Sequence, residues 1–251
     1  MRTIDLNCDM GEGFGAWRMG DDRAVMPLIS SANVACGFHA GDPGTIRETV
    51  RLAVDHGVAV GAHPSLPDLQ GFGRRAMKIS AQECYDLVLY QGGAVEAFAR
   101  AAGVRLHHVK IHGMLYNMAA KDAELADAIA RASRDLGAGI LLYALSGSLM
   151  MDAAKRHGVR AIGEVFGDRS YQADGTLTPR GQPGAMIIDE AVSVAQVLMM
   201  VERGKVRSQQ GAEVPVDAGT LCLHGDQPGA ARFAKALREA LAARGIGIAA
   251  P

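Results

Sequence analysis

The sequence has no large excess of charge of either sign. Its 251 residues carry 26 basic and 27 acidic side chains, for a formal net charge of -1. Because proteins that bind nucleic acid or an anionic membrane surface usually carry a basic excess, neither partner is expected. The chain also lacks an apolar run long enough to cross a bilayer. The first predicted strand starts near Thr3, so no signal peptide is expected either. These absences predict a soluble cytoplasmic protein that acts on a small molecule.

Several common catalytic motifs are missing as well. A P-loop is absent, because the nearest Gly-Lys pair, at Gly204, has Met199 in the place of the leading glycine. No G-x-S-x-G elbow occurs. The cysteines form no C-x-x-C pair, so buried apolar side chains in a reduced cytoplasm are predicted rather than nucleophiles or disulfides. These cysteines are Cys8, Cys36, Cys84 and Cys222.

The first segment of the chain alternates apolar and polar residues, as a strand does. Asp5, Asn7 and Asp9 share one face of this strand, and apolar residues occupy the other. The run ends in Gly11-Glu12-Gly13, which allows a sharp turn. A strand with a polar face in the lumen and an apolar face under helices is typical of a barrel. Asp9 and Glu12 are then expected at the carboxyl end of the strand, where α/β enzymes place their chemistry.

Apolar runs alternate with helical patterns along the whole chain. Strands are predicted at Thr3–Cys8, Ala32–Cys36, Val58–Ala62, His107–His112, Gly139–Ala144, Arg160–Val165 and Gly219–Leu223. Helices are predicted at Asp21–Ile29, Gly44–His56, Ser80–Ala102, Asp122–Leu136, Ser148–His157, Asp189–Arg203 and Gly229–Arg244. Consecutive β-then-α units predict an α/β fold with a parallel sheet. The polar face of the first strand favours a single (β/α) barrel domain over residues 1–251, and an open doubly wound sheet is the alternative.

Three connecting segments stand out. Pro64–Ile79 and Phe166–Met186 are long, rich in glycine and proline, and carry many specific polar residues. Loops of this length in a compact domain are usually functional or disordered, and their polar content favours function. The third segment, Lys205–Asp217, is interpreted as a small hairpin or flap.

Polar and titratable residues follow almost every predicted strand. They include Asp9, Glu12, Asn33, His39, Asp42, His63, Asp68, Arg74, Lys110, His112, Tyr116, Glu164, Asp168, Arg169, His224 and Asp226. Because the carboxyl ends of parallel strands meet at one edge of the sheet, these side chains are expected to line one rim. Four histidines on one rim, beside carboxylates and a lysine, indicate a functional site.

Lys110 and His112 share one face of their predicted strand and are expected to point into the lumen. A buried lysine requires a carboxylate partner, which Asp5, Asp9 or Glu164 could supply. Such a lysine either polarises an anionic or carbonyl substrate or only closes a structural ion pair inside the barrel.

Two chemistries fit the rim residues. Asp9, His63 and His112 come from three strands and form a candidate site for a divalent metal that activates water. No H-x-x-H or H-E-x-x-H motif supports such a site. In the metal-free alternative, Asp9 or Glu12 is the base and the histidines donate hydrogen bonds to a developing oxyanion.

Eight ordered segments, spread between residue 4 and about residue 245, resemble the LamB/YcsF family. They are Asp5-Leu-Asn-Cys-Asp-Met-Gly-Glu12, Asn33-Val-Ala-Cys-Gly-Phe-His-Ala-Gly-Asp42, Gly61-Ala-His-Pro-Ser65, Gly71-Phe-Gly-Arg74, Val109-Lys-Ile-His-Gly113, Glu164-Val-Phe-Gly-Asp-Arg-Ser-Tyr171, Leu177-Thr-Pro-Arg-Gly181 and Leu223-His-Gly-Asp226. The resemblance implies a seven-stranded barrel similar to the glycoside hydrolase/deacetylase group. It also implies one component of ATP-dependent 5-oxoprolinase, working with partner subunits B and C. That enzyme hydrolyses the lactam of 5-oxo-L-proline (pyroglutamate) to L-glutamate while ATP, with Mg²⁺, is cleaved to ADP and phosphate.

Roles can then be assigned to the rim residues. The expected catalytic residues are Asp9, Glu12, Lys110 and His112. The expected substrate-binding residues are Asn7, His39, Arg74, Glu164, Arg169 and His224, with Arg74 or Arg169 holding a carboxylate or phosphate. A stand-alone metal-dependent deacetylase-type hydrolase and a non-catalytic subunit that only binds the substrate are the alternatives.

Overall fold

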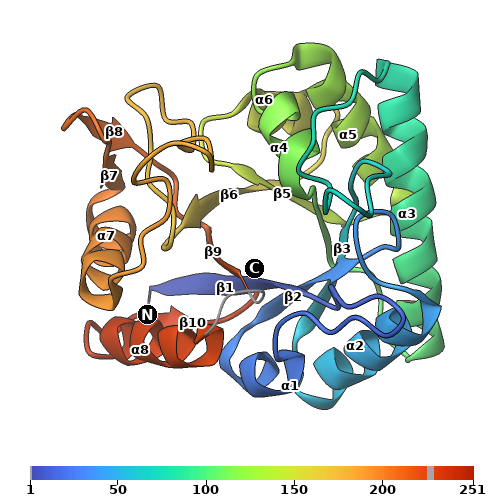
Figure 1. Ribbon diagram of the computed structural model, residues 1–251, viewed down its shortest axis with the longest axis horizontal. Helices are drawn as coiled ribbons and strands as arrows, with labels where there is room; N and C mark the ends of the chain where they lie inside the picture. The colour runs from blue at the N-terminus through green and yellow to red at the C-terminus, as the bar shows by residue number, and fades with distance from the viewer. Residues whose placement is uncertain (1, 225–228) are drawn as a thin grey trace.

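The computed structural model describes residues 2–224 and 229–251. Within them, seven parallel strands close into a barrel (Figure 1). The ring runs β1-β2-β3-β4-β5-β6-β9, and β9 pairs back with β1. The strands are β1 (Thr3–Met10), β2 (Ser31–Ala35), β3 (Ala59–His63), β4 (His108–Lys110), β5 (Leu141–Leu145), β6 (Ala161–Phe166) and β9 (Thr220–His224). The predicted closed barrel is confirmed, and the open doubly wound alternative is wrong.

Helices surround the strand ring (Figure 1). They are α1 (Asp22–Val25), the 3-10 turn η1 (Met26–Leu28), α2 (Pro43–Asp55), α3 (Ala81–Ala101), α4 (Gly113–Ala119), α5 (Ala123–Leu136), α6 (Leu149–Arg156), α7 (Glu190–Arg203) and α8 (Ala230–Ala242). Local sequence explains several of their starts. The side chain of Asp42 accepts a hydrogen bond from the Thr45 amide, one turn into α2. Ser80 and Glu83 form a capping box that opens α3.

The structure differs from the predicted elements in three places, and it confirms the hairpin predicted for 205–217. The segment predicted as one helix from Asp21 to Ile29 is a single α-turn followed by η1, because Pro27 has no amide hydrogen for a longer helix. The fourth strand is shorter than predicted, and His112 precedes the unpredicted α4 instead of ending the strand. A short strand β10 (Gly247–Ile248) pairs with the start of β1. The segment 205–217 contains a hairpin of β7 (Lys205–Arg207) and β8 (Glu213–Pro215).

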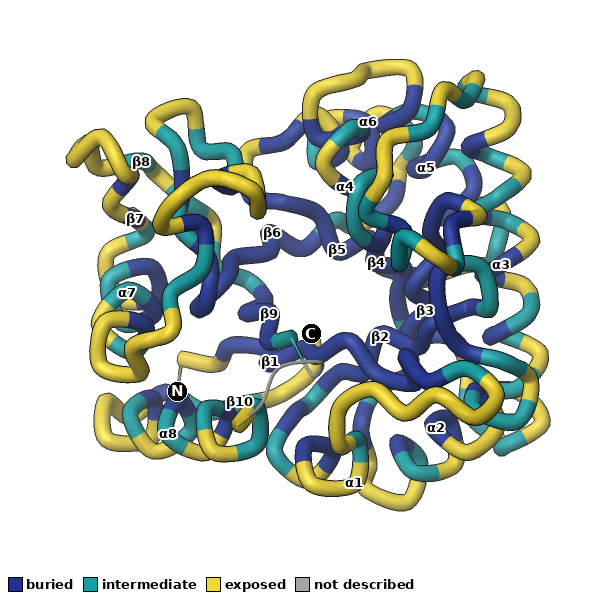
Figure 2. Tube along the Cα trace, viewed as in Figure 1, coloured by how far each residue is buried: buried dark blue, intermediate teal, exposed yellow. Residues whose placement is uncertain are grey.

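The two faces of β1 point into different parts of the interior, as the alternation of its residues predicts. Ile4, Leu6 and Cys8 belong to the apolar core under the helices, whereas Asp5 and Asn7 are equally buried in the lumen. Figure 2 shows that the strands of the ring are mostly buried and that exposed residues lie on the surrounding loops and helices and on β7 and β8. The four cysteines are buried free thiols, and burial raises the pKa of Cys8, Cys36, Cys84 and Cys222.

A polar network fills the lumen. Its members are Asp5, Asn7, Ser31, Asn33, His108, Tyr143, Glu164 and Thr220, which we call the lumen network. Asp5 accepts hydrogen bonds from Ser31 at 2.8 Å and from Thr220 at 2.6 Å. His108 bonds Asn33 at 2.7 Å, and a Cβ at Gly61 would lie 2.1 Å from the His108 ring. A glycine at position 61 therefore makes room for that ring.

Within the residues described, no helix combines the length and the apolar character that a membrane span needs.

Candidate active site at the barrel rim

The carboxyl ends of the strands converge on a small polar cavity of about 50 Å³. Its lining includes Asp9 of β1, His63 of β3, Lys110 of β4 and His224 of β9, together with His112, Tyr116, Arg74, Arg169 and Arg180. A larger cavity of about 370 Å³ adjoins it and shares Arg74, Asn117, Arg169, Leu177 and Arg180 with its lining. The predicted rim site is thus a two-part cavity with carboxylates, histidines and a lysine at its inner end.

Lys110 lies at the inner end of this cavity between two carboxylates. Its Nζ is 2.5 Å from Oδ1 of Asp9 and 3.4 Å from Oε1 of Glu164. Burial alone would lower the pKa of Lys110, but the adjacent carboxylates and the Cys222 sulfur raise it well above its ordinary value. Of the three carboxylates that sequence reasoning offered to this lysine, Asp9 and Glu164 are the partners.

Asp9 is held as a carboxylate. Burial would raise the pKa of its carboxyl group, but His63 and Lys110 lower it well below the ordinary value. Asn33 also donates to Oδ1 of Asp9 at 2.9 Å, so this oxygen already has two donors. The other oxygen, Oδ2, lies 3.3 Å from Nε2 of His63.

Asn7 and Glu164, predicted to bind substrate, lie within the lumen network and outside the lining of the two cavities. Asn7 donates to Glu164 at 3.0 Å and to Thr220 at 2.7 Å. Tyr116 donates to the second oxygen of Glu164 at 2.6 Å. These bonds hold Glu164 under Lys110, and a direct contact of either residue with substrate stays a prediction.

Two histidines of the rim face each other. Nδ1 of His63 lies 2.7 Å from the carbonyl oxygen of Lys110, and Nε2 of His112 lies 2.8 Å from that of Phe72. The remaining nitrogens, Nε2 of His63 and Nδ1 of His112, are 3.0 Å apart. Burial, followed by the nearby His39, lowers the pKa of His112 well below its ordinary value.

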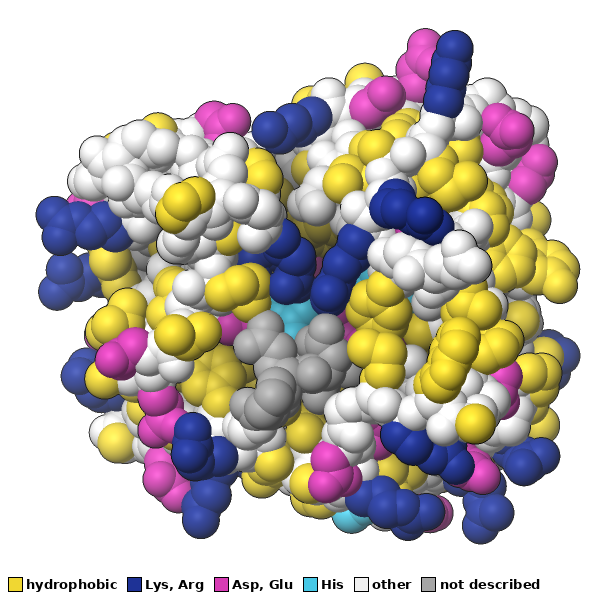
Figure 3. All heavy atoms as spheres, in the orientation of Figure 1, with side chains coloured by type: hydrophobic (Ala, Val, Ile, Leu, Met, Phe, Trp, Pro, Cys, Tyr) yellow, Lys and Arg dark blue, Asp and Glu magenta, His cyan; other side chains and the backbone are white. Residues whose placement is uncertain are grey.

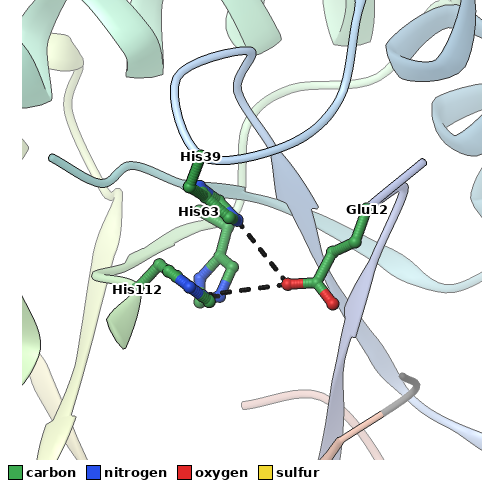
Figure 4. Close-up of side chains that lie close together, drawn as sticks. All are labelled: Glu12, His39, His63 and His112. Atoms are coloured by element: carbon green, nitrogen blue, oxygen red, sulfur yellow. Dashed lines mark hydrogen bonds and ion pairs between the residues drawn. The ribbon is translucent and has the colours of Figure 1, made fainter. Parts of the chain in front are cut away.

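Glu12 and His39 complete this group (Figure 4). Oε1 of Glu12 lies 3.6 Å from Nε2 of His39 and 3.8 Å from Nδ1 of His112. The His39 ring stacks on His112 with centroids 3.8 Å apart, and neither of its nitrogens hydrogen-bonds a residue that the structure describes. Burial lowers the pKa of His39 well below its ordinary value, which favours the neutral ring.

We call Glu12, His39, His63 and His112 the rim cluster; one donor atom from each lies within 4.8 Å of the others, which is compatible with a bound metal ion. Asp9, Cys222 and His224 form a second such group. The ligand set predicted from the sequence, Asp9, His63 and His112, spans both groups and stays a prediction. Sequence reasoning gave Glu12 and His39 other roles, because both follow their strands on loops whose paths it could not trace.

His224 is fixed on the opposite side of the cavity. Its Nδ1 lies 2.7 Å from Oδ2 of Asp168, and Arg180 donates to its Nε2 at 3.0 Å. Since a guanidinium can only donate, Nε2 of His224 accepts and Nδ1 carries the hydrogen that Asp168 receives. Burial would raise the pKa of Asp168, but His224 lowers it below the ordinary value.

Arginines surround the mouth of the cavity. Figure 3 shows basic side chains gathered beside a histidine near the centre of this face. Arg169, on the long loop after β6, is buried and donates to the carbonyl oxygen of Thr178 at 2.6 Å. Burial, reinforced by Arg180, lowers the pKa of Arg169 to about 10. Arg74, on the long loop after β3, lies over the Phe72 ring with its Cζ 4.8 Å from the ring centroid. Both loops that sequence reasoning singled out therefore contribute to the cavity.

Comparison with known proteins decides the family. The family model described as "LamB/YcsF family" matches residues 4–251. This chain belongs to the LamB/YcsF family. A protein of Bordetella parapertussis, named as the A subunit of 5-oxoprolinase, is 62% identical over 99% of this chain and 98% of its own length. One of Tolumonas auensis with the same name is 58% identical over 100% of both chains. A crystal structure of the lactam utilization protein from Thermus thermophilus is 49% identical, with a TM-score of 0.93, and covers 99% of this chain and 100% of that one.

Several supporting residues of this LamB/YcsF barrel escaped sequence reasoning. The carbonyl oxygen of Phe72 orients His112, and Phe72 has a positive φ of 54°, which no side-chain pattern reveals. Gln91 of α3 bonds both the amide and the carbonyl of Ser65 and so fixes the loop after β3. Asp226, which sequence reasoning placed on the rim, lies outside the described residues.

Proposed function

We propose that this chain is the A subunit of an ATP-dependent 5-oxoprolinase, which hydrolyses the lactam of 5-oxo-L-proline to L-glutamate. The observation that carries the proposal is the end-to-end similarity to relatives that bear this name, which are 54% to 62% identical to this chain. The similarity to a lactam utilization protein supports the same substrate class.

The chemistry of a lactam explains a requirement for ATP. A five-membered lactam is an unactivated amide, and water attacks it slowly at neutral pH. Transfer of the γ-phosphoryl group of ATP to the lactam oxygen would give an imidate with phosphate as its leaving group. Water can then add to the ring carbon, and the ring C–N bond breaks as the nitrogen takes up protons, which leaves an acyl phosphate. A second water hydrolyses this acyl phosphate to the carboxylate of glutamate and free phosphate. ATP, with Mg²⁺, is therefore proposed as co-substrate.

The cavity suits a small anion with a polar reacting centre. Arg74 and Arg169 flank both of its parts and are proposed to hold the carboxylate of oxoproline or the transferred phosphate. At the inner end, the Lys110 ammonium would polarise the lactam oxygen or stabilise the charge that develops on it. Asp9 or Glu12 would accept the proton of the attacking water, and His112 would orient it. His39 and His224 are proposed as further contacts of the substrate, on opposite sides of the centre.

Asn7 and Glu164 are proposed to act through Lys110. Glu164 lies 3.4 Å from the lysine nitrogen, and Asn7 donates to the same Glu164 oxygen. Their contribution is to hold the ammonium in place, since both lie deeper in the barrel than the lining of the cavity.

Subunits B and C are proposed as partners, because the relatives' name implies further subunits and no P-loop occurs in this chain. We expect the assembly to work in the cytoplasm, where ATP is available and buried cysteines stay reduced.

The decisive assay is glutamate release from 5-oxoproline with ATP and Mg²⁺ present. It compares this chain alone, subunits B and C alone, and the mixture. Glutamate and ADP in the mixture only would support the proposal, and no glutamate in any sample with correctly folded partners would refute it. Asp9→Asn and Lys110→Ala test the residue roles, which are wrong if both variants retain full activity in the mixture.

Two alternatives predict different results. A stand-alone metal-dependent deacetylase would release acetate from an acetylated sugar without subunits B and C and would not act on oxoproline. A subunit that only binds the substrate would bind oxoproline tightly, and turnover by the mixture would survive the removal of the rim carboxylates.

A further inference from the structure

The rim cluster contains two histidine nitrogens that oppose each other and would both be acceptors if both rings were neutral. In neutral histidine one nitrogen carries the hydrogen and the other accepts. The backbone carbonyls of Lys110 and Phe72 can only accept, so the hydrogens of His63 and His112 lie on the nitrogens that face those carbonyls. Nε2 of His63 and Nδ1 of His112 therefore present lone pairs to each other at 3.0 Å. A positive species, either a shared proton or a metal cation, has to lie between them.

The surroundings favour a metal over a proton. Histidines that bind metals almost always donate their second N–H to a carbonyl or carboxylate, as both of these histidines do. Two nitrogens about 2.0–2.1 Å from one tetrahedral zinc ion are about 3.3 Å apart, close to the separation of 3.0 Å in this site. Oε1 of Glu12 lies 3.8 Å from Nδ1 of His112, which is too long for a hydrogen bond but suits a neighbouring ligand of the same ion.

His39 is close to this point but is not oriented as a ligand. Its ring is parallel to that of His112 within 8°, with centroids 3.8 Å apart. A metal ion binds imidazole in the plane of the ring, and two stacked parallel planes cannot contain the same ion. His39 therefore covers the site with its ring face and takes part only through packing.

We propose that a divalent transition-metal ion of the zinc class is bound by Nε2 of His63, Nδ1 of His112 and the carboxylate of Glu12. Two imidazoles and one carboxylate are ligands of borderline softness, which suit Zn²⁺, Co²⁺ or Fe²⁺ better than Mg²⁺ or Ca²⁺. Three protein ligands leave a coordination position free, as in catalytic rather than structural sites. Asp9 lies next to this site, with its Oδ2 3.3 Å from Nε2 of His63. With Glu12 and His112 bound to the ion, Asp9 is the one of the two proposed bases that is left to accept a proton, and the ion rather than His112 would orient the water. The inference stands apart from the oxoprolinase proposal, because metal binding is measured without turnover.

The first test uses the full chain after treatment with a chelator and removal of the chelator. ZnCl₂ and CoCl₂ are titrated in a calorimeter, and the Co²⁺ sample is followed by its visible absorption. One ion per chain, with the absorption of a cobalt site of low coordination number and a rise in Tm, is the expected result. Failure of the wild-type chain to bind either ion at one per chain would overturn the proposal and leave a shared proton as the positive species.

Variants then test the ligand set. His63→Phe and His112→Phe are each expected to weaken binding more than roughly tenfold, the loss that follows removal of even an outer partner of a metal ligand. Glu12→Gln, which keeps the shape of the side chain, is expected to do the same. His39→Phe keeps the stacked ring but removes its nitrogens, and its affinity should match the wild type.

The exposed His56 provides the matched control, since His56→Ala removes a surface histidine that lies outside the cluster. Unchanged affinity in the His63→Phe/His112→Phe double variant, checked for folding by circular dichroism, would overturn the proposed site. Loss of binding in His39→Phe would overturn the ligand set. Where a histidine variant does not fold, the wild-type titration and Glu12→Gln still decide the proposal.

Discussion

The lumen network and the rim cluster are both buried and polar, yet their hydrogen bonding differs. In the lumen network, Asp5 accepts from Ser31 and Thr220, and Asn7 donates to Glu164 and Thr220, all at 2.6–3.0 Å. In the rim cluster, the separations from Glu12 to two histidines are 3.6 and 3.8 Å, and two histidine nitrogens that would both be acceptors in neutral rings meet at 3.0 Å. Because an unsatisfied buried polar group is costly, only the first arrangement is complete by itself.

This difference distinguishes buried polar groups that stabilise the fold from buried polar groups that bind a ligand. A fully hydrogen-bonded network holds the strands in register and needs no ligand to complete its hydrogen bonding. Histidine nitrogens that present lone pairs to one another cost stability unless a substrate or ion supplies what is missing. The comparison predicts that changes in the lumen network that leave Asn7 and Glu164 in place alter stability, and that changes at the rim alter binding and turnover.

Lys110 lies at the junction of the two regions, and its removal should have the largest effect. Lys110→Met keeps most of the side-chain volume but leaves Asp9 and Glu164 as adjacent buried carboxylates. Breaking a buried ion pair in this way is expected to lower the free energy of unfolding by about 3–5 kcal/mol. Urea denaturation measures the loss. The matched control is Lys205→Met in the exposed pair with Glu213, which should leave the urea midpoint unchanged. Equal midpoints for the two variants would contradict the assigned importance of the buried pair.

The lumen network itself should respond in stability alone. Thr220→Val keeps the shape of the side chain but removes the hydroxyl that donates to Asp5 and accepts from Asn7. The expected cost is about 1–3 kcal/mol of unfolding free energy, since two buried polar groups each lose a partner. In the reconstituted enzyme, KM and kcat per folded molecule should equal those of the wild type. A change in KM would show that the network reaches the substrate after all.

Sequence patterns captured the parts of this molecule that depend on short periodicities. Alternation in β1 and β4 gave the strand ring and directed Asp9 and Lys110 into the lumen, where they form an ion pair. The predicted helix starts at Gly44 and Ser80 lie within one residue of the observed starts of α2 and α3. These features follow from residues close together in the chain, so a local pattern suffices.

The rest of the site depends on how distant segments meet. The surroundings of Glu164 follow from the register of β6 against β9, because this register places Glu164 directly beside Thr220. The tautomer of His112 depends on the carbonyl of Phe72, a backbone group 40 residues away in sequence. The stack of His39 on His112 depends on the loop after β2. No local pattern contains this information. Sequence reasoning therefore named these residues but could not assign a role to each of them.

At the rim, substitution should change binding and spare stability. Arg74→Gln removes a guanidinium that lines both cavities but keeps a polar side chain. Loss of one charge-assisted hydrogen bond to an anion, worth about 1.5 kcal/mol, should raise the apparent KM for oxoproline or ATP about tenfold. Steady-state kinetics of the reconstituted enzyme would show which of the two substrates is affected. An unchanged KM for both substrates, together with a lower urea midpoint, would show that Arg74 stabilises the fold and does not bind substrate.

The smallest predicted effect is a change in how stability depends on pH. Burial lowers the folded-state pKa values of His39 and His112 at the rim and of His108 in the lumen network. Below about pH 6.5, the ordinary histidine pKa, the unfolded chain therefore binds more protons than the folded one. Stability should accordingly fall as the pH drops from about 7.5 to about 5.5 in chelator-treated protein.

The contribution of the rim to this pH dependence can be isolated. His39→Phe removes one of the three groups and should reduce the loss of unfolding free energy over that pH interval by about 1 kcal/mol. Asp9 does not interfere, because its lowered pKa places its contribution at acidic pH, where stability is lost only as the pH falls toward the folded-state value. The exposed His56, which lies outside the rim cluster, serves again as the control through His56→Ala. If the unfolding free energy of His39→Phe and of wild type changed equally with pH, the His39 ring would take up a proton in the folded state. The rim would then resemble the lumen network, because its polar groups would be satisfied without a ligand.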